Sequence, residues 1–329
     1  MTEHRTPAAH TDVLTIGETM AMVTPEAGGR LDADSTYLLR PGGAESNVAA
    51  SLAQLGHRAH WASALGADRL GDLVTTVLAG HGVDTSLVRR DPGRPTGVYF
   101  KDPTPEGTRV SYYRSGSAAA GLGPADVAAW TAAVRPRVVH LSGILPALSP
   151  SCAALARHIV VDRPWGDAPV SFDVNHRPVL WSGQPAGAAE TLLELAQRSD
   201  IVFVGRDEAE ALWGTTDAES VRALVDGPER LVVKDAAVEA VAFTGGRVTR
   251  VPSRRVRVVD AVGAGDAFAA GWLSGWLTGH RETLCLGLGH YAAAQVLASA
   301  SDLAELPRAA EIVAGLVDEP APSGVTTGG

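Results

Sequence analysis

Short apolar segments alternate with helical segments along most of this chain, and this alternation constrains the fold more than any other feature. A strand followed by a helix, repeated in this way, is typical of a parallel β-sheet covered by helices. With 329 residues, of which 45% are hydrophobic and 20% are charged, the chain can bury a large core as one α/β domain or as a domain with an appendage. Strands are predicted at residues 13–17, 61–65, 138–141, 170–174, 201–204, 231–234 and 238–243, and helices at about 47–55, 72–79, 151–161, 266–277 and 282–300.

One segment interrupts this alternation. Residues 97–100 and 109–114 are predicted to form a hairpin, because two strand-like runs flank a turn rich in Pro and Gly. Residues 25–35 indicate further turns between short exposed strands. The hairpin carries three tyrosines and an arginine, namely Tyr99, Tyr112, Tyr113 and Arg114. They either fill a small sheet or, on a flap, contact a small polar ligand.

The junction at residues 259–268 combines two glycines with a carboxylate. A β-like run at 256–259 leads into Gly263 and Gly265, and a strongly apolar helix follows. Glycines here allow successive backbone N–H groups and the positive end of the helix dipole to point at one spot, which suits a phosphate. Asp266 in the first helical turn is either a catalytic group beside that anion or an ordinary helix-start charge.

Two other stretches contain polar residues at positions where ligands bind. Residues 40–47 place Gly42 and Gly43 before a helix, which indicates either a close backbone approach to a ligand or a plain tight turn. Asp173, Asn175 and Arg177 follow a predicted strand, and ligands of open α/β sheets gather beyond the carboxyl ends of strands.

Composition excludes several functional classes. A net charge of −9 argues against a nucleic-acid partner, and the basic cluster Arg254, Arg255 and Arg257 is interpreted as the solvated face of a strand. Cys152 and Cys285 lack any metal-ligand spacing, so we expect buried, reduced thiols. No signal peptide is evident and no apolar run is long enough to span a membrane, so a cytoplasmic protein without a membrane partner is predicted.

The sequence does not support nucleotide binding through either of two common motifs, the dinucleotide-binding G-x-G-x-x-A turn and the P-loop. Residues 287–292 fit the pattern G-x-G-x-x-A, but they lie inside a predicted helix and not at a strand-to-helix turn. The sequence also has no P-loop motif.

Two motifs together resemble the signatures of the ribokinase-like (PfkB) carbohydrate kinases. They are GGAESNVA at 42–49 and DAVGAGDAF at 260–268, and their order and spacing match over nearly the whole chain. Within this family, Tyr99, residues 112–114, residues 141–144 and especially DVNHRPVLW at 173–181 resemble 2-keto-3-deoxygluconate kinases.

The resemblance implies a doubly wound, mostly parallel sheet flanked by helices, with a small β-strand lid drawn from about 22–40 and 95–115. It implies a single domain over 12–318, with flexible tails at 1–11 and 319–329. The implied reaction is ATP-dependent phosphorylation of 2-keto-3-deoxygluconate to its 6-phosphate. Mg²⁺ is the implied cofactor, a monovalent cation is a further candidate, and a homo-oligomer formed through the lid is expected.

The family motifs also assign roles to individual residues. Asp266 is the implied base, with Gly263, Ala264 and Gly265 stabilising the transferring charge. Glu208 belongs to the N-x-x-E motif and would act indirectly on Mg²⁺. The implied sugar-acid contacts are Gly42, Gly43, Asn47, Tyr99, Tyr112, Arg114, Ile144, Arg177 and Asp266. The implied ATP contacts are Asn175, Arg177, Lys234, Gly263, Gly265 and His290.

Arg114 and Arg177 are predicted to grip the carboxylate of an acidic substrate. Two planar guanidinium groups can make bidentate hydrogen bonds to a carboxylate, and a neutral ketose has no carboxylate to accept them. The alternative is that both arginines are surface residues paired with nearby carboxylates.

Three departures from the family pattern leave alternatives open. Gly205 replaces the Asn of N-x-x-E, and Ala236 and Glu239 replace glycines of the nucleotide-side loop, so ATP and metal binding are less defined than the catalytic assignment. Met22 stands where hydroxyl-binding sugar kinases commonly have Asp, which counts against fructokinase and ribokinase. A neutral-ketose kinase and a ligand-binding protein without turnover remain as alternatives, and the sequence does not distinguish the gluconate from the galactonate epimer.

Overall fold

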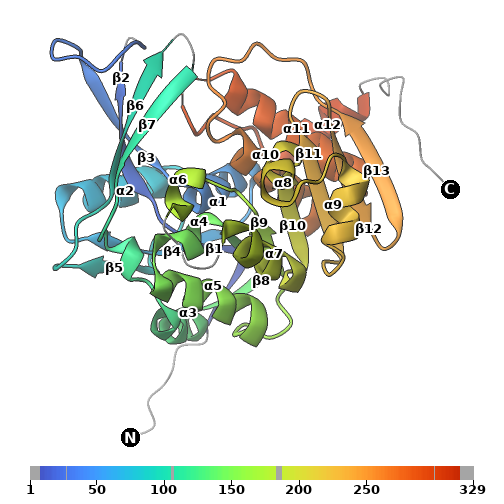
Figure 1. The fold of residues 1–329 in the computed structure, drawn as a ribbon, viewed down its shortest axis with the longest axis horizontal. Helices are drawn as coiled ribbons and strands as arrows, with labels where there is room; N and C mark the ends of the chain where they lie inside the picture. The colour runs from blue at the N-terminus through green and yellow to red at the C-terminus, as the bar shows by residue number, and fades with distance from the viewer. Residues whose placement is uncertain (1–7, 27, 105–106, 183–186, 300, 319–329) are drawn as a thin grey trace, which may run out of the picture.

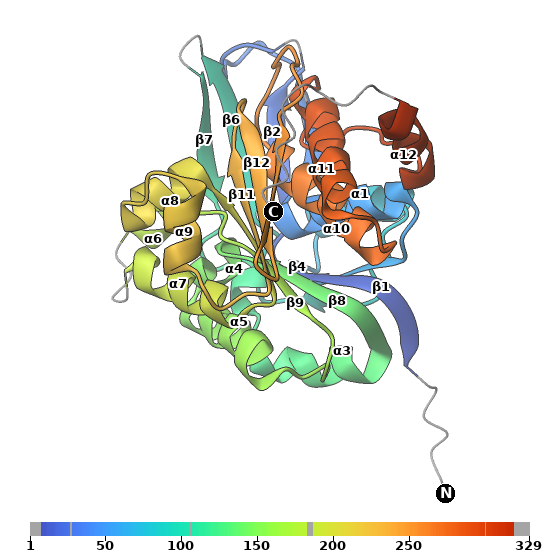
Figure 2. The same cartoon turned by 90° about the vertical axis from the view of Figure 1, so that its right-hand side faces the viewer.

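The computed structural model describes residues 8–26, 28–104, 107–182, 187–299 and 301–318. Within these residues a nine-stranded sheet has helices on both faces, and a separate four-stranded sheet projects from one edge of this layered body (Figure 1 and Figure 2). The order of the large sheet is β13-β12-β11-β10-β9-β8-β1-β4-β5. Every neighbouring pair from β11 to β5 is parallel, whereas β12 and β13 are antiparallel. The expected doubly wound, mostly parallel sheet is confirmed.

The strands of the large sheet are β1 (Ala9–Ile16), β4 (Ala59–Gly66), β5 (Val88–Asp91), β8 (Val134–Ser142), β9 (Val170–Asp173), β10 (Ile201–Gly205), β11 (Arg230–Asp235), β12 (Glu239–Thr244) and β13 (Arg247–Pro252). The helices are α1 (Ala44–Leu55), α2 (Arg69–Gly80), α3 (Val127–Ala133), α4 (Ile144–Leu148), α5 (Pro150–Asp162), α6 (Pro178–Trp181), α7 (Ala188–Arg198), α8 (Arg206–Trp213), α9 (Ala218–Leu224), α10 (Ala264–Leu277), α11 (Glu282–Leu297) and α12 (Ala309–Asp318).

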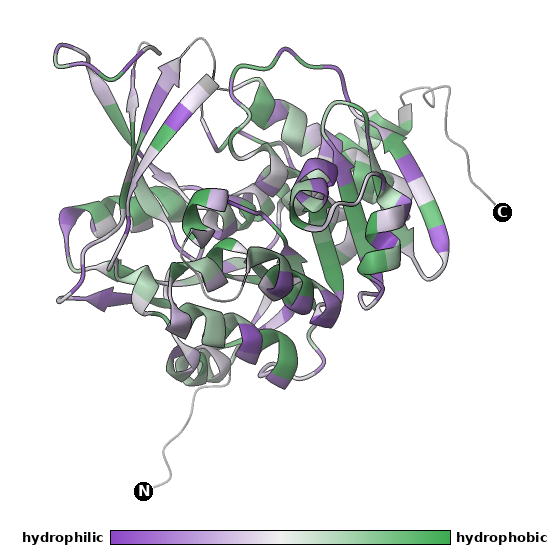
Figure 3. Cartoon of the chain, in the orientation of Figure 1, coloured by the Kyte–Doolittle hydropathy of each residue, from purple (hydrophilic) through white to green (hydrophobic). Residues whose placement is uncertain are grey.

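Two apolar clusters fill the space between the sheet and its helices. Side chains of α3, α5, α7 and α9 pack on one face of the sheet, and those of α1, α2, α10 and α11 pack on the other. The central strands are coloured as apolar in Figure 3, as expected for a parallel sheet that is buried on both faces. Trp272 of α10 meets Phe203 of β10 edge to face, with ring centroids 5.4 Å apart, which seats α10 on the sheet.

Helix α10 packs very closely against α11 because glycines line the contact. A Cβ at Gly271 would lie 2.4 Å from the Leu288 carbonyl oxygen, and one at Gly275 would lie 2.9 Å from Cys285 Cα. The residues that fit G-x-G-x-x-A lie within α11, as predicted, and therefore form no dinucleotide turn. Close packing of this kind holds the first turn of α10 in a fixed place.

The four-stranded sheet is the lid. Its order is β3-β2-β6-β7, formed by β2 (Met20–Pro25), β3 (Tyr37–Gly42), β6 (Val98–Thr104) and β7 (Gly107–Tyr113). The predicted hairpin is the β6–β7 pair. β2 is mostly buried, so the expectation of only exposed strands around residues 25–35 is wrong.

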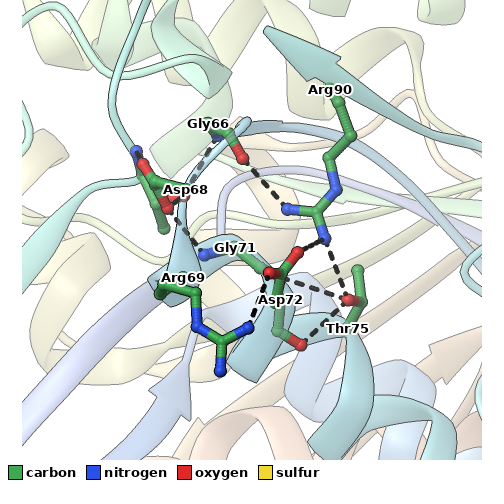
Figure 4. A network of polar contacts seen from close by, with 8 residues as sticks. Gly66, Asp68, Arg69, Gly71, Asp72, Thr75 and Arg90 are labelled. Carbon is green, nitrogen blue, oxygen red and sulfur yellow. Dashed lines mark hydrogen bonds and ion pairs between the residues drawn. The ribbon is translucent and has the colours of Figure 1, made fainter. Parts of the chain in front are cut away.

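A polar network fixes the turn where β4 enters α2, close to the base of the lid (Figure 4). Asp68 caps α2 by accepting a hydrogen bond from Gly71 N at 2.8 Å, and its other oxygen accepts one from Thr96 N at 2.8 Å. Arg90 Nη2 bonds to Asp72 Oδ1 at 2.8 Å and Arg90 Nη1 donates to the Gly66 carbonyl. Because Thr96 lies just before β6, this network ties the lid to the large sheet.

Several predicted boundaries need correction. Residues 256–259 form no strand, because the last strand, β13, ends at Pro252 and both Val258 and Val259 are more than half exposed. The arginine cluster therefore lies on a loop, where the Arg254 guanidinium sits over the Tyr291 ring. Strand β1 begins at Ala9, so residues 9–11 belong to the sheet and not to a tail, while residues 1–7 and 319–329 lie outside the described residues.

Both cysteines are buried and free, as expected. Burial raises the pKa of the Cys152 thiol to about 11 and that of Cys285 to about 12, so both stay protonated at neutral pH. Among the described residues, no helix is long and apolar enough to cross a membrane.

Candidate active site

A cavity of about 400 Å³ lies between the lid and the carboxyl ends of the central strands. This is the edge of the sheet at which ligands of doubly wound folds bind. The predicted site residues that line it are Gly42, Gly43, Asn47, Tyr99, Tyr112, Arg114, Ile144, Asn175, Arg177, Glu208, Lys234, Gly263, Gly265 and Asp266. The fold thus brings together motifs from both ends of the chain.

Two predicted residues do not line the cavity. Ala264 is the first residue of α10, directly behind the glycine loop. His290 lies on α11, where its Nε2 is 3.0 Å from the Val251 carbonyl oxygen and its ring meets Phe268 edge to face. The predicted contact of His290 with ATP therefore has no support from this cavity.

Asp266 is buried on the cavity wall and held by two amides. Asn47 Nδ2 donates to Asp266 Oδ2 at 2.9 Å, and Asn175 Nδ2 donates to Oδ1 at 3.3 Å. Burial raises the pKa of Asp266 to about 7, an effect that the Asn47 hydrogen bond opposes and the nearby Asp173 carboxylate reinforces. A carboxyl group with a pKa near neutrality can both accept and release a proton under physiological conditions.

Asn175 adopts a left-handed backbone conformation, which is uncommon for residues other than glycine and is tolerated best by asparagine. Its φ is +39°, in the left-handed region, and the residue is 5% exposed. This conformation aims the amide at Asp266, while the Oδ1 atoms of Asn47 and Asn175 have no hydrogen-bond partner. Two buried amide oxygens are therefore left to accept hydrogen bonds from a ligand.

Gly263 and the first turn of α10 have the geometry of an anion nest. Gly263 is the N-cap of this 14-residue helix, with φ +84° and no side-chain cap, and Val262 N donates to Asp260 Oδ1 at 3.1 Å. Helix N-terminal amides and the helix dipole favour a negative ligand at this place. A Cβ built on Gly265 would meet only Lys234 Nζ, at 3.5 Å, so the ammonium lies directly beside the nest.

Lys234 is a largely buried cation beside the nest, with a side chain that is 18% exposed. Its Nζ lies 2.8 Å from Asp173 Oδ2. Burial lowers the pKa of Lys234, but the Asp173 and Glu208 carboxylates outweigh burial and leave this pKa above its ordinary value. The side chain is therefore charged at neutral pH and can stabilise charge on a phosphate.

Glu208 joins two loops at the edge of the cavity. Its Oε2 accepts a hydrogen bond from Gly205 N at 2.9 Å, and its Oε1 accepts one from His176 N at 3.1 Å. Burial, reinforced by Asp173, raises the pKa of Glu208. Because both carboxylate oxygens already accept backbone hydrogen bonds, the geometry suits an indirect role.

Ala236 and Glu239, which replace glycines of the nucleotide-side loop, affect the structure in different ways. Ala236 keeps a left-handed conformation, with φ +36°, although it has a side chain. Glu239 begins β12 and forms an ion pair with Arg250 of β13, with Oε1 and Nη1 2.5 Å apart. The first change leaves the turn strained, and the second adds a contact within the sheet edge.

On the lid side, Arg114 is already paired. Its Nε donates to Glu18 Oε2 at 2.6 Å, and Glu18 Oε1 accepts from Ser117 Oγ at 2.5 Å. Arg177 is more open: its side chain is 44% exposed and its Nη1 lies 3.7 Å from Glu208 Oε1. Both arginines line the cavity, as predicted, and both also have a neighbouring carboxylate, which is the pairing that the alternative interpretation expects.

Three charged residues of the cavity wall were not predicted as site residues. They are Glu18, Lys101 and Asp302. Tyr99 OH donates to Asp302 Oδ2 at 3.0 Å, and Lys101 Nζ lies between Asp302 and Asp260. None of the motifs identified in the sequence contains these residues.

Comparison with known proteins agrees with this geometry. Residues 10–309 match the model of the pfkB family carbohydrate kinases. The chain is 38% identical to a 2-dehydro-3-deoxygluconokinase of Bacillus subtilis (strain 168), over 82% of this chain and 84% of the relative. It is 32% identical to a 2-dehydro-3-deoxygalactonokinase of Haloferax volcanii, over 89% of this chain and 93% of the relative.

A solved structure has the same fold. The crystal structure of a PfkB protein from Polaromonas sp. JS666 superimposes with a TM-score of 0.81 at 34% identity, covering 92% of this chain and 99% of that one. The family model spans most of the chain, including both glycine motifs and the lid. This chain therefore belongs to the pfkB family of carbohydrate kinases.

Proposed function

We propose that this kinase transfers the γ-phosphoryl group of ATP to 2-keto-3-deoxygluconate and forms the 6-phosphate. The observation that carries the proposal is the position of Asp266, which lies between an anion nest and a cavity whose sugar side carries Arg114 and Arg177. The relative at 38% identity, a 2-dehydro-3-deoxygluconokinase, supports the same substrate.

The residues of the cavity fit the phosphates of ATP. Gly263 and Gly265 leave room for phosphate oxygens at the helix start, and Lys234 places a positive charge beside them. Asp266 would take the proton of the attacking hydroxyl, while the nest and Lys234 would stabilise the charge on the transferred group. Phosphoryl transfer needs little else from a protein beyond positioning of the two substrates.

Oxygen ligands for Mg²⁺ are also available. Asp173 Oδ1 is buried without a hydrogen-bond partner, and the Glu208 carboxylate lies close to Asp173. We infer that Asp173 and Glu208 organise Mg²⁺, which neutralises phosphate charge when bound. A requirement for a monovalent cation stays a prediction.

The outer face of the lid supports a dimer as the working form. Leu39 is 49% exposed and Tyr113 is 67% exposed. Tyr113 stacks edge to face on Phe100, which borders a shallow apolar hollow together with Val23. Exposed apolar residues gathered on one sheet face mark a protein interface, and we infer that a second copy covers this one.

A coupled assay of ADP release tests the proposed function. The panel contains 2-keto-3-deoxygluconate, its galactonate epimer, 5-keto-2-deoxygluconate, fructose and ribose, and the Asp266→Asn protein is the control for contaminating kinases. We expect the highest kcat/KM with 2-keto-3-deoxygluconate. Preference for fructose would favour the neutral-ketose alternative, and no turnover with any acceptor would favour a ligand-binding protein.

Substitutions at the two nest glycines separate activity from stability. Gly265→Val should abolish most activity with little change in Tm, because its Cβ meets only the Lys234 ammonium but its methyl groups enter the phosphate site. Gly263→Ala should lower Tm as well, because its φ is +84° and its Cβ would lie 2.5 Å from the Asp302 carbonyl oxygen. Activity assays and thermal melts of both variants check this contrast, and an equal loss of Tm at Gly265 contradicts it.

A further inference from the structure

The sequence contains only two lysines, Lys101 and Lys234, and the other 26 of its 28 basic residues are arginines. Both lysines line the cavity, and each lies within 3 Å of a buried carboxylate. An ammonium is a compact point charge, whereas a guanidinium is a wide planar fork. In a chain that uses arginine almost everywhere else, including Arg114 and Arg177 of this cavity, the two lysines indicate that their own positions need a compact cation. Lys234 is already explained by the nest, so Lys101 is the residue that requires a function.

Lys101 extends from the lid to the loops around the anion nest. It belongs to β6, its residue exposure is 2%, and its Nζ lies 2.9 Å from Asp260 Oδ2 and 2.5 Å from Asp302 Oδ1. Tyr99, two residues earlier on the same strand, donates to the other oxygen of Asp302. Two side chains of one lid strand therefore hold the loop that contains Asp302.

Asp260 and Asp302 in turn hold the nest. Asp260 Oδ1 accepts the hydrogen bond from Val262 N, the residue before Gly263. The backbone of Asp302 packs directly against Gly263, since a Cβ there would lie 2.5 Å from the Asp302 carbonyl oxygen. Gly263 is thus positioned by the loops that contain Asp260 and Asp302, and both carboxylates contact the Lys101 ammonium of the lid.

The positive charge of Lys101 also affects the electrostatics of the proposed phosphate site. Two carboxylates beside the place where a triphosphate binds would repel it, and Lys101 offsets one of these two charges. A buried carboxylate that has lost its partner is strongly unfavourable, and here it would also face an anionic ligand.

We propose that Lys101 is a positioning residue that joins the lid to the anion nest and whose ammonium charge permits the nucleotide triphosphate to bind. The proposal rests on the proposed function only in taking the nest as the nucleotide phosphate site. It assigns to strand β6 of the lid, whose Tyr99 also lines the cavity, a direct influence on nucleotide affinity.

Calorimetric titration with a non-hydrolysable ATP analogue and Mg²⁺, without any sugar acid, tests this proposal. Lys101→Met should weaken binding by roughly tenfold or more, because the carboxylate pair loses its only lysine. Adding Asp302→Asn to this variant should recover most of the affinity, because the double change restores the net charge of the wild-type group. Arg109→Met is the matched control, since it removes an exposed positive charge from the neighbouring lid strand β7. It should bind within about twofold of wild type.

Two results would overturn the proposal: wild-type affinity in Lys101→Met, or a double variant that binds no better than Lys101→Met. Thermal melts establish that each variant is folded. If Lys101→Met does not fold, Asp302→Asn is compared with the double variant, and equal affinity of these two also overturns the proposal. Because no sugar acid is present, the titration is independent of the acceptor, so a wrong substrate assignment is seen only in the ADP-release assay.

Discussion

Asp266→Asn is expected to lower turnover by roughly two to four orders of magnitude, the range for loss of a general acid–base group. The variant should fold and bind nucleotide as the wild type does, because asparagine has nearly the same shape as aspartate. Asn47 and Asn175 each donate to one carboxylate oxygen, so the side chain is held toward the cavity by contacts that an amide oxygen can partly keep. Single-turnover and steady-state rates, with calorimetric nucleotide binding, measure the effect.

The pH profile provides an independent test of the same role. The base must be ionised to accept a proton, and the pKa of Asp266 is raised to about 7, chiefly by burial. The kcat/KM of the wild type should therefore rise as the pH increases through about 7 and level off above it, and Asp266→Asn should lose this rise. Turnover close to wild type in the asparagine variant, or a flat wild-type profile between pH 6 and pH 8, contradicts the assignment.

Arg177→Met is expected to lower kcat/KM for 2-keto-3-deoxygluconate by roughly 10- to 100-fold. The kcat/KM for fructose should change little, because only the acid forms charge-assisted hydrogen bonds with the guanidinium group. Arg177 lines the cavity, and its nearest carboxylate, Glu208, is 3.7 Å away. Arg69→Met is a suitable control, because that side chain is 97% exposed on the first turn of α2. The prediction fails if the ratio of acid to ketose activity is the same in wild type and Arg177→Met.

Arg114 requires a different variant because it also neutralises Glu18. Replacing Arg114 alone leaves the buried Glu18 carboxylate without its ion pair, which costs stability whether or not the arginine binds substrate. The double variant Arg114→Met with Glu18→Gln removes both charges together. A loss of acid specificity that persists in this double variant, with Tm near that of Glu18→Gln alone, separates substrate binding from folding.

The sequence allowed the layered fold to be predicted because strand and helix patterns are local. Short apolar runs identified β1, β4, β8, β9, β10 and β11 of the parallel sheet. Residues 256–259 resemble an edge strand because Val and Arg alternate there. They form no strand because β13 ends at Pro252, which pairs with Glu239, the first residue of β12, so β12 offers no further partner. Strands β5 and β13 were not predicted, since their short or polar sequences have too little apolar character to indicate a strand.

Site residues could be predicted from the sequence where a short motif specifies its own local backbone geometry. Glycines at a strand-to-helix turn and an acid in the first helical turn specify a local shape, and Gly263, Gly265 and Asp266 line the cavity as expected. Lys101 and Asp302 could not be found in this way, because they are 201 residues apart and meet only through packing of the lid on the nest loops. The scarcity of lysine was the signal that pointed to Lys101, and it is a property of the whole sequence, not of any motif.

The placement of both lysines also determines how the protein reacts with amine-directed chemistry. Acylating, reductively alkylating or cross-linking reagents find no side-chain amine on the exterior, since the only two ε-amino groups are in the cavity wall and engaged with carboxylates. Covalent labelling of a lysine therefore reports directly on access to the cavity, and a bound ligand should protect against it. Conversely, attachment to surfaces or dyes through a lysine side chain would modify the cavity itself.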